Sequence, residues 1–232
     1  MGEGIRERIE QVRRRIAQAA SRSGRDPNDV QLVAVTKSVA VSQIREALDA
    51  GLTVFGENRV QEAKGKVARL SSPSIEWQLV GTLQTNKSKL AVELFDLIHS
   101  LDSVKLAASM DRHGAALRKQ VRALIEINLG GESDKSGLHE SELLPLLQAC
   151  RAYAHLTIEG LMAIPPFHRD PQAARPFFRR LRLLRDEASD THPDIRLRHL
   201  SMGMSNDFEV AIEEGATLVR IGRAIFGNSV EA

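Results

Sequence analysis

The residue best placed to do chemistry in this 232-residue chain is Lys37, which ends an apolar run. Residues 31–37 read QLVAVTK, and the unbroken apolar stretch is typical of a strand buried on both faces by helices. The carboxyl ends of parallel strands are where sites assemble, because the loops there can vary while the sheet stays rigid. The alternative is that Lys37 is an ordinary solvated loop lysine. The residues at the other predicted strand ends argue against this interpretation.

Two glycine-containing segments near the end of the chain could bind an anion. They read SMGMS at 201–205 and RIGR at 220–223, and each follows an apolar, strand-like run. Glycine lets an anion approach backbone N–H groups, serine adds a hydroxyl donor, and a helical turn over 224–226 would point its positive end inward. In barrels of parallel strands the last two strands often supply such a phosphate site, although each glycine taken separately is more often a turn residue.

An amine and a phosphate site on one face together indicate a phosphorylated aldehyde held on Lys37 as a Schiff base. Pyridoxal phosphate is the obvious candidate. The amine must then be partly desolvated, so that its neutral form is accessible. Arg220 would lie beside the pyridine nitrogen, where a cation disfavours a protonated ring and makes the cofactor a poor electron sink. This argues against transaminase-like chemistry.

Eight strand-like runs, each followed by a helical stretch, must position these residues. The predicted strands cover residues 31–37, 53–55, 76–80, 96–99, 123–127, 157–162, 195–200 and 217–221. An extra helix precedes them, with Ile5, Ile9, Val12 and Ile16 on one stripe. Strict alternation requires a parallel sheet with right-handed crossovers, so the chain is predicted to form one closed (β/α)8 barrel of TIM type, a single domain over residues 1–232. An open doubly wound sheet is the alternative.

Composition argues against several other classes of protein. The net charge of +2 is too small to indicate a nucleic-acid partner, and no apolar run approaches the roughly 20 residues of a membrane span. The opening segment is charged and helical rather than a signal peptide, so we expect a soluble, cytoplasmic protein. Cys150 is the only cysteine, which excludes an intrachain disulfide, and the seven histidines show no metal-ligand spacing, so no metal is expected.

Short motifs are spread in order along nearly the whole chain. They are AVTK (34–37), FGEN (55–58) with VQE (60–62), GTLQ (81–84) with NK (86–87), SG (136–137), GLMAIP (160–165), LSMGMS (200–205), and VRIG (219–222) with IFG (225–227). Together they closely resemble the pyridoxal phosphate homeostasis protein family. The last two motifs taken together are highly specific.

The resemblance implies a barrel similar to the N-terminal domain of alanine racemase, with pyridoxal phosphate bound to Lys37. It implies that Asn58 flanks the ring and that Arg220 faces its nitrogen. It further implies that the phosphate is surrounded by Ser201, Met202, Gly203, Gly222 and Arg223. The implied role is to keep the free cofactor low while supplying it to pyridoxal phosphate-dependent apo-enzymes, with no catalytic residue and no established turnover. We expect a monomer.

Three positions depart from the family pattern. Val39 stands where many members have a second lysine, Gln78 stands where they have a histidine after the tryptophan, and Arg223 replaces a small hydroxyl residue. The first change leaves Lys135 as the remaining nearby amine for cofactor transfer. The third removes a hydroxyl contact to phosphate but not a backbone contact.

Two enzymatic alternatives use the same residues. An amino-acid racemase with this barrel uses a tyrosine from a separate domain as a second base, whereas the only tyrosine, Tyr153, is expected on the opposite face. A barrel isomerase of a phosphorylated sugar would use Lys37 or Glu57 and would not bind pyridoxal phosphate. Glu57 and Asp102 could act as acid or base, or could instead satisfy loop amides or Lys37.

Overall fold

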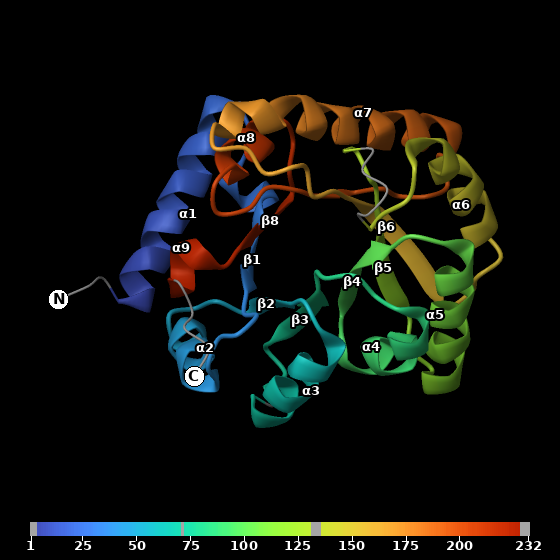
Figure 1. Cartoon of the computed structure of the whole chain (residues 1–232), viewed down its shortest axis with the longest axis horizontal. Helices are drawn as coiled ribbons and strands as arrows, with labels where there is room; N and C mark the ends of the chain where they lie inside the picture. The colour runs from blue at the N-terminus through green and yellow to red at the C-terminus, as the bar shows by residue number, and fades with distance from the viewer. Residues whose placement is uncertain (1–3, 71, 131–135, 228–232) are drawn as a thin grey trace.

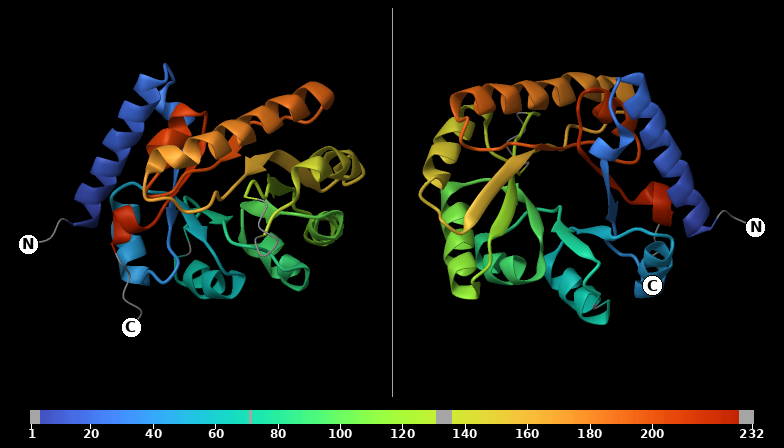
Figure 2. Two further views of the ribbon diagram at one scale, coloured as in Figure 1. Left: turned by 45° about the horizontal axis from the view of Figure 1, so that its top comes forward. Right: turned by 180° about the vertical axis from the view of Figure 1, so that it is seen from behind.

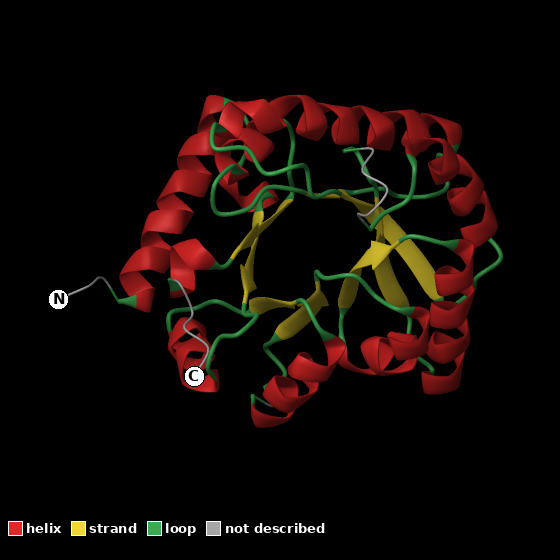
Figure 3. Ribbon diagram, in the orientation of Figure 1, coloured by secondary structure: helices red, strands yellow, loops and turns green. Residues whose placement is uncertain are grey.

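The fold is a ring of eight parallel strands surrounded by helices (Figure 1, Figure 3). The computed structural model describes residues 4–70, 72–130 and 136–227. Neighbouring strands follow the chain order, and β1 pairs with β8, so the sheet is a closed barrel. The predicted (β/α)8 barrel with a preceding helix is therefore confirmed, and the open doubly wound sheet is excluded.

The strands are short, and the polar residues that follow them lie at one end of the ring. The strands are β1 (Gln31–Val35), β2 (Val54–Glu57), β3 (Glu76–Leu79), β4 (Leu97–Leu101), β5 (Val121–Glu126), β6 (Leu156–Met162), β7 (His199–Ser201) and β8 (Leu218–Ile221). The helices are α1 (Ile5–Arg22), α2 (Val41–Asp49), α3 (Val60–Arg69), α4 (Ser88–Leu94), α5 (Val104–Leu117), α6 (Leu143–Cys150), α7 (Arg175–Thr191), α8 (Phe208–Glu213) and α9 (Arg223–Phe226). None of the helices in the described ranges is long and apolar enough to cross a membrane.

The seventh strand differs from its predicted bounds. Residues 195–200 were predicted as the strand, but β7 begins only at His199. The preceding residues fold back on themselves, because the N–H of Leu197 donates to the carbonyl of Ile195 and that of Arg198 to the carbonyl of Arg196. The apolar pattern of this segment therefore reflects local packing rather than pairing with a neighbouring strand.

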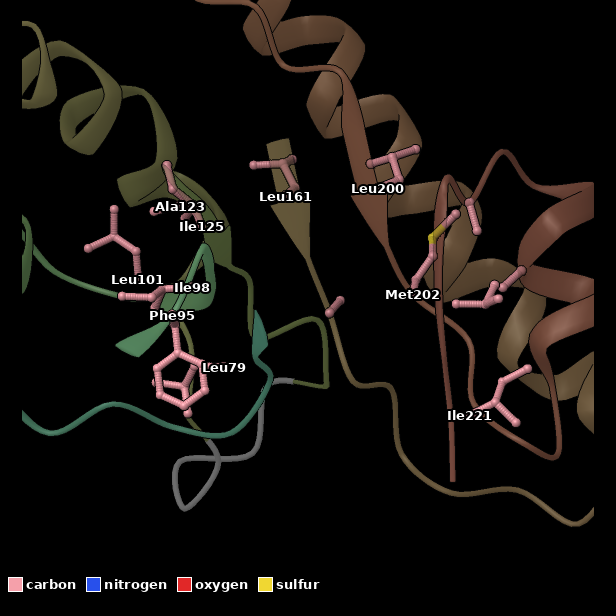
Figure 4. Packing of buried hydrophobic residues seen from close by; sticks show 14 of the residues in the cluster. Leu79, Phe95, Ile98, Leu101, Ala123, Ile125, Leu161, Leu200, Met202 and Ile221 are labelled. Carbon is pink, nitrogen blue, oxygen red and sulfur yellow. The ribbon is translucent and has the colours of Figure 1, made fainter. Parts of the chain in front are cut away.

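Successive side chains of each strand point alternately outward and inward, and the two sets differ in character. The outward set packs against the helices in the main hydrophobic core, which includes Leu79, Ile98 and Leu161 (Figure 4). A second, smaller cluster comes from the inward set and contains Val33, Val54, Val80, Leu97, Leu124, Met162 and Leu218. The same inward set includes buried polar residues, namely Gln78, His99, Glu126, Ser201 and Arg220. The interior of the barrel thus contains a polar region next to a small apolar cluster.

Helix α1 covers the seam where the barrel closes. Figure 2 shows it in blue beside the red helices α8 and α9, and it packs against both. Its buried stripe includes the predicted residues Ile5, Ile9, Val12 and Ile16. Arg15 adds an ion pair to Glu209 of α8, with 2.7 Å between Nε and Oε1. The extra helix therefore buries apolar surface that the short α8 and α9 would otherwise expose.

The barrel is most tightly constrained between β6 and β7. Pairing between β5 and β6 shifts by one residue after Ala123, which leaves Glu159 as an extra residue in β6. The next residue, Gly160, lies so close to β7 that an added Cβ would be 2.0 Å from the carbonyl oxygen of His199. Only glycine allows this approach of the two backbones.

We predict that Gly160→Ala lowers the free energy of unfolding by about 3 kcal/mol, because the methyl group must push two strand backbones apart. Urea denaturation followed by circular dichroism measures the change. The matched control is Gly65→Ala in α3, where an added Cβ meets nothing within 4 Å. The control should gain up to about 1 kcal/mol from helix propensity. If Gly160→Ala were as stable as the control, the close approach of β6 and β7 would be refuted.

Candidate functional site

A cavity of about 360 Å³ lies at the carboxyl ends of β1, β2 and β8. Five of the predicted site residues line it. These are Lys37, Asn58, Arg220, Gly222 and Arg223. Residues 164–167 and 204–207 form other parts of the wall. We call it the Lys37 cavity. The strand-end positions chosen from the sequence thus converge on one concave surface.

Lys37 occupies a tight turn directly after β1. The N–H of Val39 donates to the carbonyl of Thr36 at 3.0 Å, which makes Lys37 and Ser38 the central residues of the turn. Ser38 has a φ of 56°, a left-handed conformation that few non-glycine residues adopt, so its surroundings must hold it there. The Lys37 side chain is exposed. The partial desolvation of its amine stays a prediction.

A second lysine, Lys66, holds this turn from beneath. Its residue is only 8% exposed, and its Nζ donates to the carbonyl of Thr36 at 2.6 Å and to the carboxylates of Glu57 at 2.8 Å and Glu62 at 2.6 Å. Glu57 also accepts the hydroxyl of Thr36, and Glu62 accepts the N–H of Ser38 at 2.8 Å. Burial raises the pKa of Glu57, while the hydrogen bonds from Lys66 and Thr36 act in the opposite direction. Glu57 thus pairs with Lys66 and supports the turn.

Lys66 was missed in the sequence, although two signals pointed to it. It lies on the buried stripe of α3 with Val60 and Ala63, and it follows Glu62 by four residues. A lysine on the apolar face of a helix is expected only where a carboxylate pairs with it. The spacing in the sequence therefore indicated that Lys66 pairs with a carboxylate. It did not indicate that this pair supports the turn that carries Lys37.

Arg220 lies inside the barrel and is 4% exposed. Its Nη1 donates to Ser201 Oγ at 2.6 Å, and its Nη2 donates to the carbonyl of Ala163 at 3.0 Å. Burial lowers the pKa of Arg220 to about 10, while Glu126 and Asp207 act in the opposite direction. The guanidinium therefore keeps its positive charge at neutral pH and is fixed in orientation.

A line of hydrogen bonds continues from Arg220 across the barrel interior. Ser201 Oγ lies 2.9 Å from His99 Nδ1, and His99 Nε2 lies 2.8 Å from Gln78 Oε1. Because a guanidinium can only donate, Ser201 accepts from Arg220 and gives its own proton to Nδ1, so His99 carries its proton on Nε2. Burial lowers the pKa of His99 well below its ordinary value, so the ring is neutral. Gln78, which departs from the family pattern, accepts from His99 and donates to Glu76 Oε1 at 3.0 Å, so it continues the line that Arg220 begins.

The residues of the first glycine segment lie beneath the Lys37 cavity rather than in its wall. Ser201 faces the barrel interior, and Met202 is fully buried in the main core (Figure 4). Gly203 has a φ of 90°, and an added Cβ there would lie 2.5 Å from that of Ala211. Ser201, Met202 and Gly203 therefore support the loop that follows them, residues 204–207, from beneath.

Residues 204–207, which follow this segment, form the wall instead. Within the described ranges, the backbone N–H groups of Ser205 and Asn206 have no hydrogen-bond acceptor, which leaves them free to donate to a ligand. Gly222 faces them from β8, where an added Cβ would lie 3.1 Å from the carbonyl oxygen of Val35. It thereby lets the end of β8 approach the turn that carries Lys37.

Glu126, at the end of β5, is a further functional candidate that was missed in the sequence. It is 6% exposed, and its Oε2 is buried with no hydrogen-bond partner in the described structure. Burial raises the pKa of Glu126 to about 7, with Arg220 lowering it and Asp102 raising it further. The apolar run before Glu126 identified the strand, but nothing in that run indicated an unpaired carboxyl.

Another cavity, of about 730 Å³, lies at the opposite end of the barrel. Its lining includes Tyr153 and the first residues of β6, as expected for a tyrosine that precedes that strand. Despite its size, it holds none of the strand-end groups described above. No group of three or more metal-ligating side chains occurs in the described ranges, and Lys135 lies outside them.

Comparison with known proteins gives a family and a fold. The family model described as alanine racemase, N-terminal domain, matches residues 8–230. The pyridoxal phosphate homeostasis protein of Aquifex aeolicus is 44% identical over 221 residues, which cover 95% of this chain and 96% of that protein. The protein of the same name from Escherichia coli K12 is 39% identical over 226 residues, which cover 96% of each chain.

Solved structures agree with this relationship. PipY of Synechococcus elongatus, solved with PLP bound, superposes with a TM-score of 0.85 at 38% identity and covers 96% of this chain and 100% of that chain. The alanine racemase of Clostridium difficile superposes with a TM-score of 0.74 at 11% identity, covering 98% of this chain and 58% of that chain. The likeness to the alanine racemase concerns the fold alone.

We predict that Lys66→Met lowers the free energy of unfolding by about 3 kcal/mol, because Glu57 is then buried without its counter-charge. Chemical denaturation measures the change. Lys64→Met, on the exposed side of the same helix, is the control and should change stability by no more than about 0.5 kcal/mol. The double variant Lys66→Met, Glu57→Gln should recover part of the loss. Equal stabilities for Lys66→Met and Lys64→Met would show that the buried pair contributes nothing.

A pH-dependent prediction concerns Glu126. Its pKa rises from the ordinary 4.5 to about 7 in the folded chain, so its contribution to stability is present below pH 4.5 and is lost as the pH rises through about 7. Glu126→Gln removes this loss, and its stability relative to the parent should therefore improve above pH 7 by up to about 3 kcal/mol. Denaturation midpoints at both ends of this range measure it. Glu93→Gln, an exposed control, should show no such trend, and a flat profile for Glu126→Gln would contradict the raised pKa.

Proposed function

The chain belongs to the pyridoxal phosphate homeostasis protein family, and on this basis we propose that it binds pyridoxal 5′-phosphate on Lys37 and serves the intracellular homeostasis of that cofactor. The observation that carries the proposal is the convergence of Lys37, Arg220 and the loop of residues 204–207 on one cavity. The PLP-bound structure of PipY, at 38% identity, supports it.

The residues of the Lys37 cavity fit each part of this cofactor. Lys37 offers an accessible primary amine on a turn that Lys66 holds in place. The free N–H groups of Ser205 and Asn206, together with the Arg223 guanidinium, suit a phosphate. Asn58 and Arg220 provide polar groups for the ring. The volume of about 360 Å³ lies within the range of small-ligand sites.

The bound cofactor would supply an aldehyde that condenses with a primary amine and a ring that can withdraw electrons. Lys37 provides the amine, and its exposure lets water take up the proton that it must lose. Arg220 remains positively charged, and a cation facing the ring nitrogen keeps that nitrogen from accepting a proton. In this arrangement the chain retains the cofactor while leaving it a weak electron sink.

We propose retention and supply of the cofactor rather than turnover of an amino acid. Racemisation needs a base on each side of the reacting carbon, and neither a tyrosine nor a histidine of the described ranges lines the Lys37 cavity. Tyr153 lies at the other end of the barrel, and His99 has both ring nitrogens engaged in the interior. Asp207 lines the cavity, but its carboxylate accepts the N–H of Met204 at 2.7 Å.

The proposal extends to recipients and location. We infer that the chain supplies pyridoxal phosphate-dependent apo-enzymes in the cytoplasm and acts as a monomer. Dispersed surface apolar groups support the monomer: large exposed apolar side chains of the described part occur singly or in pairs on α5, α6, α7 and the rim of the Lys37 cavity.

We predict that borohydride treatment of the chain loaded with pyridoxal phosphate fixes the pyridoxyl group on Lys37. Borohydride reduces the C=N bond to a stable amine, and Lys37 is the cavity's amine. Mass analysis of proteolytic peptides locates the label. Lys37→Ala should lose it, while Lys87→Ala should retain it. A label found mainly on Lys87 or Lys135, with Lys37 unmodified, would overturn the assignment.

A further inference from the structure

The cavity of about 730 Å³ at the amino ends of β6 and β7 has no part in the proposed function. Its wall carries three arginines, Arg151, Arg196 and Arg198. The wall also includes apolar side chains, namely Leu156, Ile158, Ile195 and the ring of Tyr153. We call it the Tyr153 cavity. Cationic groups and apolar surface are thus combined at the end of the barrel opposite to Lys37.

Both carboxylates in the wall of the Tyr153 cavity are already neutralised. Glu159 accepts two hydrogen bonds from Arg122, each of 2.9 Å, and Asp194 pairs with an arginine of the same wall. Arg196 and Arg198, in contrast, have no side-chain hydrogen bond and no ion pair in the described part of the chain. The cavity therefore presents two positive charges that no carboxylate of its wall compensates.

The backbone before β7 places these two arginines on the same side. The segment of residues 195–198 is folded on itself by two backbone hydrogen bonds, of 3.0 and 3.1 Å. Leu197, between the two arginines, is 5% exposed and packs in the main core, whereas Arg196 and Arg198 are exposed and line the cavity. Like charges on one wall repel each other, so a bound anion relieves their repulsion.

The two arginines suit a phosphate monoester. A guanidinium presents planar donors that match phosphate oxygens, and it stays charged at neutral pH. Two such groups balance the charge of a phosphate monoester, which is about −2 at pH 7. The anionic part of the ligand is therefore assigned to the wall formed by Arg196 and Arg198.

The rest of the Tyr153 cavity suits a planar, partly polar group. Tyr153 is half-buried, and its hydroxyl has no hydrogen-bond partner in the described ranges. Its ring can stack on a nucleobase, with Ile158 adding apolar contact. The hydroxyl of Thr157 accepts from Gln120 at 2.8 Å and keeps its own proton to donate. A sugar phosphate leaves the apolar surface unmatched, and an uncharged nucleoside leaves both arginines unmatched.

We propose that the Tyr153 cavity binds a nucleoside monophosphate, with the base against Tyr153 and the phosphate on Arg196 and Arg198. The volume of about 730 Å³ lies within the range of small-ligand sites. This inference goes beyond the proposed function, because it concerns the other end of the barrel and a different class of ligand. The nucleotide would bind at the amino ends of β6 and β7, whose carboxyl ends lead into the loops that form part of the wall of the Lys37 cavity.

The test uses Tyr153 itself as the reporter, because it is the only tyrosine of the chain. The full chain is produced with 3-fluorotyrosine, loaded with pyridoxal phosphate so that the Lys37 cavity is occupied, and titrated with AMP. The single ¹⁹F NMR signal should shift saturably. Adenosine and ribose 5-phosphate, which lack the phosphate and the base respectively, should bind at least about tenfold more weakly. Absence of a saturable shift with AMP, or binding of ribose 5-phosphate or inorganic phosphate as tight as that of AMP, would overturn the proposal.

Variants show whether the nucleotide binds in this cavity or acts on Tyr153 from elsewhere. Arg196→Met and Arg198→Met should each weaken AMP binding by about tenfold or more, because each removes a charge-assisted contact to the phosphate. Both replace exposed side chains, so they should unfold at the same denaturant concentration as the parent. Arg69→Met, which replaces an exposed arginine outside the cavity, is the matched control and should bind AMP like the parent. Equal AMP binding by all three variants would refute the site.

The outcome is distinguishable from failure of the proposed function. Lys37→Ala removes the amine that takes the cofactor, yet it should leave the response of Tyr153 to AMP in place, because Lys37 does not line the Tyr153 cavity. Absence of the pyridoxyl label from the parent chain, with intact AMP binding, would therefore refute the cofactor site only. Absence of AMP binding, with the label on Lys37, would refute the nucleotide site only.

Discussion

The geometry of the site depends on one buried charge, the ammonium group of Lys66. Removing a lysine from water is costly, and the cost is met only where several acceptors surround it. Here Glu57, Glu62 and the carbonyl of Thr36 do so, and each of them is tied to the segment around Lys37. The same contacts hold Ser38 in a left-handed conformation that a serine adopts only under constraint. The exposed, chemically useful lysine is thus positioned by a buried one.

The strand residues of the barrel are likewise divided between two roles. The outward positions of the strands are apolar and stabilise the fold, while several inward positions are polar and are satisfied by one another. Arg220, Ser201 and His99 form a line in which each hydrogen bond fixes the direction of the next. The neutral His99 thereby acts as a spacer that orients Ser201 and, through it, the guanidinium. Polar groups in the interior are tolerated because nearly all of them have partners, and Glu126 is the informative exception.

The sequence was sufficient for the architecture and for part of the site. Alternation of strands and helices predicted the closed barrel, and the strand-end rule placed Lys37, Asn58, Arg220, Gly222 and Arg223 around one cavity. Ser201 and Met202 lie outside the lining of that cavity, because a motif shows which residues are near a site but not which way each points. The two-residue alternation along β7 puts Leu200 outward and Ser201 inward, and it leaves the next loop to form the wall. The start of β7 and the pairing of Lys66 depended on contacts between distant segments, which no local pattern contains.

The shortness of β7 also has a dynamic consequence. This strand has three residues, and backbone hydrogen bonds from Thr217 to Leu200, from Met202 to Leu218 and from Arg220 to Gly203 join its segment to that of β8. Protein structures open locally in cooperative units, and an opening of the seam between β7 and β8 has to break only these few backbone bonds. Ser201 lies at that seam and also holds Arg220, so each opening event releases the guanidinium from one of its two anchors. The residence time of a ligand beside Arg220 is thereby coupled to the fluctuation of a single strand.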